Sequence, residues 1–131
     1  ETLQEPREIF KGGTSVYWLT HYVFGQPSPS HPKTLSQSSI DLLIINTVVP
    51  FLYAYGKHKG EERLCNRASQ LLEDLKPENN YITRMWEECG LKAAHAGDSQ
   101  ALIQLKKNYC DSKKCLYCRI GYEYFKKEQK E

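Results

Sequence analysis

Apolar residues recur at three- and four-residue spacing from Ile40 onward, and this spacing is typical of an α-helix that buries one face. The stripe of the first predicted helix consists of Ile40, Leu43, Ile44, Thr47, Val48 and Phe51. Ser38 or Ser39 can cap its first turn. Because the segment is apolar nearly all round, we expect it at the centre of the fold. Pro50 lacks an amide hydrogen and crowds the carbonyl of Asn46, so a kink is expected there.

Four further helices are predicted from the same spacing, over residues 61–75, 79–89, 98–110 and from 115 into the charged C-terminal end. Asn79 or Asn80 can cap the helix at 79–89 and Gly90 can end it. Its Trp86 is expected in the core, and Asp98 or Ser99 can open the next helix. The last of these contains Gly121, which weakens it. No long stretch alternates apolar and polar residues as a strand does. The sequence therefore predicts an all-α fold, a compact bundle or short stack of about five helices.

The start of the chain has a different composition. It carries an aromatic run and then the segment GQPSPSHPKTLSQSS, whose proline and serine content disfavours regular structure. We expect an irregular N-terminal segment over residues 1–39 and a helical domain over residues 40–131. Since the sequence begins at Glu1 and not at methionine, we also expect a longer polypeptide with an upstream portion.

Length and composition favour a soluble, cytoplasmic protein. At 131 residues and 40% hydrophobic, the chain is long enough for one core. Its longest apolar stretch, residues 42–55, is interrupted by polar residues and proline and is shorter than the ~18 residues of a membrane span, so no membrane is expected. Five cysteines, an odd number, disfavour a fully paired disulfide framework, and reduced thiols fit a cytoplasmic location.

Three cysteines lie within nine residues, in the run YCDSKKCLYCRIG. Cys110 is predicted at the end of one helix, and Cys115 and Cys118 on one face of the next, so that three sulfur atoms can converge. Zinc is the expected metal, and Cys89 is the favoured fourth ligand. The other candidates for the fourth ligand are Cys65, His58 and His95.

Alternatives to zinc remain open for this segment. The x4-x2 spacing equals that of plant-type iron–sulfur ferredoxins, but no cysteine follows downstream, so a cluster is less favoured. A disulfide between two of the three thiols and three reduced, packed thiols are the other possibilities. Lys113 and Lys114 could favour a thiolate, and together with Asn46 at the predicted kink they are the candidate binding residues.

Three segments carry a resemblance to a known family: YWLTHYVFG at 17–25, LLIINTVVPFLYAYGKHKGEE at 42–62 and DSQALIQLKKNYCDSKKCLYCRIG at 98–121. They resemble the C-terminal portion of an uncharacterised, Bacteroidetes-type bacterial protein family that is catalogued only as a domain of unknown function. The resemblance covers nearly the whole chain. It implies no activity, and it marks the INT-x-x-P helix and the triple-cysteine segment as the distinctive features.

The sequence contains no phosphate-binding loop, nucleophile elbow or metal-binding His-Glu helix motif, so no catalytic residue is assigned and an enzymatic activity is left open. The favoured function is a non-catalytic helical accessory or interaction module, whose partner is another protein or an upstream domain of the same polypeptide. The alternative is a nucleic-acid-associated domain. From Lys106 onward eight basic residues face four acidic ones with tyrosines between them, although a solvated helix surface is the commoner cause of such a pattern.

Overall fold

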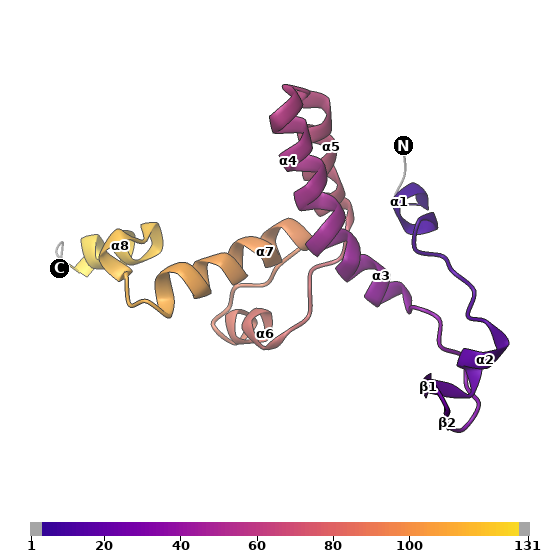
Figure 1. Ribbon diagram of the computed structural model, residues 1–131. Coiled ribbons are helices and arrows are strands. Elements are labelled where there is room, and N and C mark those ends of the chain that lie inside the picture. The colour runs from indigo at the N-terminus through magenta and orange to yellow at the C-terminus, as the bar shows by residue number, and fades with distance from the viewer. Residues whose placement is uncertain (1–3, 129–131) are drawn as a thin grey trace. The chain divides into compact units, whose positions relative to one another are not determined.

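The computed structural model describes residues 4–128 and is 65% helical, which confirms the all-α prediction (Figure 1). The chain forms two compact units, Glu1–Leu71 and Leu72–Glu131, and the division falls inside helix α5 (Glu62–Asp74). Each unit is described separately. The boundary predicted from composition, at residue 39, lies within helix α3 (Gln37–Leu43), and the division into domains at that point stays a prediction.

The N-terminal segment contains short elements: α1 (Gln4–Glu8), α2 (Val16–Leu19), and strands β1 (His21–Val23) and β2 (Gln26–Pro27). The two strands form an antiparallel hairpin in which His21 pairs with Pro27 and Val23 with Gln26. Gly25 supplies the left-handed conformation of the turn, with φ +71°. The aromatic run noted in the sequence forms this hairpin and the helical turn before it.

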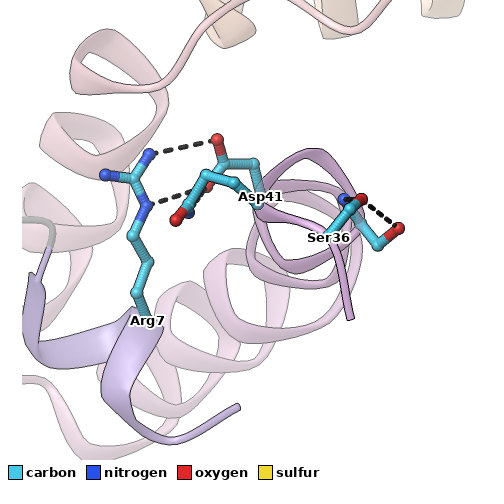
Figure 2. A network of polar contacts seen from close by, with 5 residues as sticks. Arg7, Ser36 and Asp41 are labelled. Atoms are coloured by element: carbon cyan, nitrogen blue, oxygen red, sulfur yellow. Dashed lines mark hydrogen bonds and ion pairs between the residues drawn. The ribbon is translucent and has the colours of Figure 1, made fainter. Parts of the chain in front are cut away.

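A bidentate ion pair joins the N-terminal segment to α3. Arg7 Nε and Nη2 donate to the two carboxylate oxygens of Asp41 at 2.9 and 3.0 Å, and Gln37 donates to the same carboxylate at 3.1 Å (Figure 2). Both charged side chains are largely shielded from solvent, with 24% and 15% of the side-chain surface exposed. Two parallel charge-assisted bonds fix the relative orientation of the two segments as well as their contact.

Helix α3 continues through a π-helical turn, η1 (Ile44–Val48), into α4 (Val49–Lys59). Its N-cap is Ser36, whose Oγ accepts from the Ser39 amide at 3.1 Å, so the prediction of Ser38 or Ser39 as the cap is wrong. Ser36 has the extended conformation of a capping residue and lies one turn before the apolar stripe begins. The π-turn precedes Pro50, and the Val49 amide bonds to a carbonyl five residues earlier. Figure 1 shows the helix changing direction here, as predicted.

The long helix from α3 to α4 is buried on one side only, which does not agree with the central position predicted for it. Its buried residues are Ile40, Ile44, Ile45, Val49 and Gly56. At 23 residues, Gln37–Lys59 is long and apolar enough to cross a membrane by length and composition, and 28% of its most apolar 18-residue stretch is buried. The apolar stretch at residues 42–55, predicted to be too short for a membrane span, is part of this longer helix, because its polar interruptions do not end the helix.

Helices α4 and α5 form a hairpin, side by side in Figure 1. Gly60 ends α4 at φ +70°, and the Glu61 amide bonds to the Gly56 carbonyl at 2.9 Å. A Cβ at Gly56 would lie 2.9 Å from Cys65 Sγ, so glycine allows the close approach of the two helices. Cys65, Ala68 and Leu71 on α5 complete the buried core of the first unit.

The second unit contains α6 (Tyr81–Glu88), α7 (Ala96–Leu105), the π-turn η2 (Lys106–Cys110), the 3₁₀ turn η3 (Cys115–Tyr117) and α8 (Arg119–Glu128). Asn80 caps α6 in a capping box with Thr83, and Gly90 ends it at φ +85°, as predicted. Helix α7 begins earlier than the predicted Asp98 or Ser99. Its N-cap is His95, whose Nδ1 accepts from the Asp98 amide at 3.4 Å.

A buried hydroxyl stabilises the loop between α5 and α6. Ser99 is fully buried, donates to the Ala96 carbonyl at 2.9 Å and accepts from the Glu78 amide at 3.0 Å. The Ala96 amide bonds to the Leu75 carbonyl at 2.9 Å. Together with buried Ile82 these residues make a small core, and every buried polar atom in it has a partner.

Candidate functional site

The three clustered cysteines line one apolar cavity of about 270 Å³ in the second unit, here called the cysteine cavity. Its walls come from α6, from α7 with η2, and from η3 with α8. The lining residues are Trp86, Leu105, Tyr109, Cys110, Cys115, Cys118, Ile120, Gly121, Tyr124 and Phe125. All three thiol-bearing residues therefore line the same cavity, whereas the convergence of their sulfur atoms on a metal ion stays a prediction.

Cys110 ends the π-turn that extends α7, which agrees with its predicted place at a helix C-terminus. The chain then reverses in a Schellman motif: the Lys113 amide bonds to the Cys110 carbonyl at 3.0 Å, and the Lys114 amide bonds to the Tyr109 carbonyl at 2.9 Å. Lys113 adopts φ +51°, the left-handed conformation that glycine has at the equivalent places, Gly60 and Gly90. A lysine is strained in this conformation.

Cys115 and Cys118 occupy the two ends of a 3₁₀ turn, and the Cys118 amide bonds to the Cys115 carbonyl at 3.2 Å. Helix α8 begins only at Arg119. The expectation that both cysteines lie on one face of the last helix is therefore wrong, because the turn precedes that helix. Both residues still line the cysteine cavity, although Cys118 follows the turn with an extended backbone, φ −96° and ψ 132°. Cys115 is exposed, whereas only 8% of Cys118 is exposed.

Gly121 holds α8 against this turn. A Cβ at Gly121 would lie 2.2 Å from the Cys115 carbonyl oxygen, closer than any side chain can approach. The Tyr122 amide bonds to the Cys118 carbonyl at 2.8 Å. The glycine that weakened the helix prediction is thus the residue that lets α8 close one side of the cavity.

Partial desolvation of the sulfur beside the apolar lining is the main cause that raises the pKa of the Cys110 thiol above its ordinary value, although the residue as a whole is exposed. The neighbouring thiols of Cys118 and Cys115 raise it further, and the Lys106 ammonium opposes them. Lys106 itself pairs with Asp111, and this hydrogen bond raises the pKa of the lysine. The cavity thus favours Cys110 in its neutral form.

Zinc binding by the three clustered cysteines stays a prediction. All five cysteines are free, and among residues 4–128 no three His, Cys, Asp or Glu side chains are grouped so that they could hold a metal ion. Cys89, the favoured fourth ligand, is exposed at the end of α6 and does not line the cavity. Cys65 belongs to the first unit, where its thiol contacts the Tyr53 carbonyl at 3.6 Å. His95 caps α7.

The three candidate binding residues lie in two places. Asn46 is in the first unit, in the π-turn η1, and its amide donates to the Leu42 carbonyl at 3.0 Å, so it satisfies the backbone near the bend. Lys113 and Lys114 are exposed in the turn between Cys110 and Cys115, next to the cavity but not in its lining. A ligand role for any of the three stays a prediction.

The aromatic wall of the cavity was not predicted from the sequence. Trp86 was expected in the core, but it is half-buried, donates from Nε1 to the Leu102 carbonyl at 3.1 Å and lines the cavity. Tyr109, Tyr124 and Phe125 lie on other elements and complete the wall. The tyrosines between the lysines of the C-terminal end are the sequence feature that could have indicated this wall. In the sequence analysis they support only a nucleic-acid-binding surface.

Comparison with known proteins gives one match. No curated protein and no solved structure shows significant similarity to the chain. A family model, described as "Protein of unknown function (DUF2851)", matches residues 1–81. The matched residues include the aromatic hairpin and the whole helical segment from α3 to α5, whereas all residues that line the cysteine cavity lie beyond them. Because the match covers more than half of the residues of the chain, the chain belongs to this family of proteins of unknown function.

Proposed function

We propose that the chain is a non-catalytic helical interaction module whose binding surface is the exposed side of the helix from α3 to α4. The observation that carries this proposal is the low burial of a 23-residue apolar helix. Only 28% of its most apolar 18-residue stretch is buried. Contiguous apolar surface on a folded unit marks a place where another molecule binds. The expected partner is a protein surface, on another chain or on a further domain of the same polypeptide, in the cytoplasm.

Aromatic side chains dominate this surface. Phe51 is 70% exposed and stacks on Tyr55 with ring centroids 6.1 Å apart, and Leu43 extends the apolar side by two turns. We call Leu43, Phe51 and Tyr55 the aromatic face. Large aromatic residues are enriched at the centre of protein interfaces because they bury much area at low cost in conformational entropy.

A cationic rim borders the aromatic face at the end of α4. Lys59 Nζ lies 5.9 Å from the centre of the Tyr55 ring, and Lys57 Nζ lies 5.7 Å from that of Tyr53. Apolar centres surrounded by charged rims are typical of protein interfaces. The rim favours a partner whose apolar patch is bordered by carboxylates.

Position-specific photo-crosslinking tests the proposal in the organism that makes the protein. A photoreactive phenylalanine analogue replaces Phe51 or Tyr55 in the full-length protein, and the same analogue at Asn66, an exposed position on α5, is the matched control. We expect one dominant protein adduct from the aromatic face that is absent from the control position. Phe51→Ser and Leu43→Ser should each remove the adduct formed through Tyr55.

Two results would contradict the proposal. If the aromatic-face positions crosslink no more protein than Asn66, the surface has no protein partner. If the protein instead cosediments with lipid vesicles and Phe51→Ser abolishes that binding, the helix binds a membrane and the predicted partner is wrong.

Nucleic acid is the second candidate partner, through α8. Tyr122, Tyr124 and Phe125 are exposed there, and Lys126 Nζ lies 5.9 Å from the Tyr122 ring. Exposed rings beside cations can stack bases and contact phosphates. Binding to single-stranded DNA or RNA should then weaken steeply with added salt, since each neutralised phosphate releases counterions. Absence of binding at low salt in a fluorescence-anisotropy titration removes this candidate.

A further inference from the structure

We propose that Cys115 and Cys118 form a redox-active dithiol that closes into a disulfide by exchange with an external disulfide. Cys115 is the attacking thiol and Cys118 the resolving thiol. This proposal goes beyond the interaction surface on α4 and does not depend on it, because the two sites lie in different units of the chain.

The 3₁₀ turn gives the pair the geometry that a disulfide requires. The bond from the Cys118 amide to the Cys115 carbonyl, 3.2 Å, closes a four-residue turn. The end residues of such a turn have Cα atoms less than about 7 Å apart, and disulfides bridge Cα separations of about 4.4–6.8 Å. Both residues also line the cysteine cavity, so their side chains border the same space.

The difference in exposure assigns the order of the two steps. Cys115 is exposed and is reached first by a disulfide from solvent, whereas Cys118 is 8% exposed. The Cys115 thiolate attacks one sulfur of the external disulfide, whose S–S bond breaks and releases one thiol. The Cys118 thiolate then attacks the Cys115 sulfur, a protein disulfide forms, and the second thiol leaves. The protein dithiol is oxidised and the external disulfide is reduced to two thiols, with no other co-reactant.

Cys110 is the weaker candidate for either step. It is not part of the 3₁₀ turn that joins Cys115 to Cys118. It also lies on the other side of the reversed turn that contains Lys113.

Tryptic mapping distinguishes the possible linkages in the unmodified protein. Trypsin cleaves after Lys114 and Arg119, so Cys115 and Cys118 remain in one peptide, residues 115–119, whereas Cys110 lies in the peptide 108–113. The protein is treated with a chelator, incubated with oxidised glutathione, alkylated and digested. We expect the peptide 115–119 to lose two hydrogen atoms through an internal disulfide and to recover them with dithiothreitol.

The controls are the remaining cysteines. Cys110→Ser should still form the internal disulfide, and Cys115→Ser should not. Cys89 is exposed and distant in sequence from the others, so it should form only a mixed disulfide with glutathione. It shows in the same sample that the oxidant was active.

Three outcomes would overturn the proposal. The first is a peptide 115–119 that stays reduced or carries only glutathione adducts while Cys89 reacts. The second is a disulfide that links 115–119 to the Cys110 peptide. The third is stoichiometric zinc in the untreated protein whose removal unfolds α8, because the cysteines then serve as a structural metal site. None of these outcomes affects the crosslinking result on α4.

Discussion

Replacing Gly121 by alanine would place a methyl group against the backbone of the cysteine segment. The added Cβ would lie 2.2 Å from the Cys115 carbonyl oxygen, and ordinary contact begins at 3.4 Å. The two groups must separate by roughly 1.2 Å, and neither can rotate away because the obstructing atom is backbone. Overpacking of this kind costs about 1–3 kcal/mol, and a backbone clash belongs at the upper end.

Helix propensity opposes this cost only in part. Alanine is favoured over glycine in a helix by about 1 kcal/mol. We therefore expect Gly121→Ala to destabilise the docking of α8 by about 2 kcal/mol. The turn bond from the Tyr122 amide to the Cys118 carbonyl should be lost first, since it joins the two backbones that must separate.

Hydrogen exchange measured by mass spectrometry on the full chain is the suitable assay, because local opening of α8 need not unfold the rest. Amides of α8 should exchange about 30-fold faster in Gly121→Ala, which corresponds to the expected 2 kcal/mol. Gly97→Ala is the matched control, because its Cβ would meet side-chain atoms and not backbone, the His95 ring at 3.1 Å and Leu72 Cβ at 3.7 Å, and it should leave exchange in α8 unchanged. Unchanged or slower exchange in Gly121→Ala would refute the reasoning.

Three further predictions follow from the described geometry. Lys113→Gly should stabilise the second unit by about 0.5–1 kcal/mol in urea unfolding, since glycine relieves the strain of the left-handed backbone. The same change at Lys114, which has φ −88°, should destabilise the unit. Arg7→Ala and Asp41→Ala should couple by about 1–2 kcal/mol in a double-mutant cycle of thermal unfolding, and additive effects would contradict a direct pair. Because the pKa of Cys110 is raised in the folded protein, its contribution to folding stability is present below the ordinary thiol pKa of 9.0 and is lost as the pH rises through the folded-state pKa. Iodoacetamide should therefore alkylate Cys110 more slowly at pH 8 in the native protein than in the urea-unfolded protein.

The helices that the sequence predicted well are those whose ends carry their own signals. Asn80 caps α6, and Gly90 ends it with a left-handed turn, so local chemistry within a few residues sets both boundaries. The start of α7 was predicted too late, because His95 is an unusual cap and acceptance by its ring depends on a side-chain orientation that no pattern encodes. A capping signal is local, and it can be read from sequence only where the residue type is a common one.

For the candidate site, the spacing of Cys110, Cys115 and Cys118 predicted that they lie near one another but not their setting. The expected helical face turned out to be a 3₁₀ turn, and the left-handed Lys113 could not be anticipated, because lysine gives no turn signal. The cavity is walled by residues such as Trp86 that are distant in sequence. Their meeting depends on how α6, α7 and α8 pack.

The sequence by itself determined the all-α class, the caps of α6, the change of helix direction near Pro50 and the nearness of the three cysteines, because each depends on residues within one or two turns of each other. Only the tertiary structure decided which side of the helix from α3 to α4 is covered, since periodicity shows that a side is apolar but not what packs on it. It also decided the role of Gly121, whose missing side chain matters because a backbone carbonyl of another segment occupies that space.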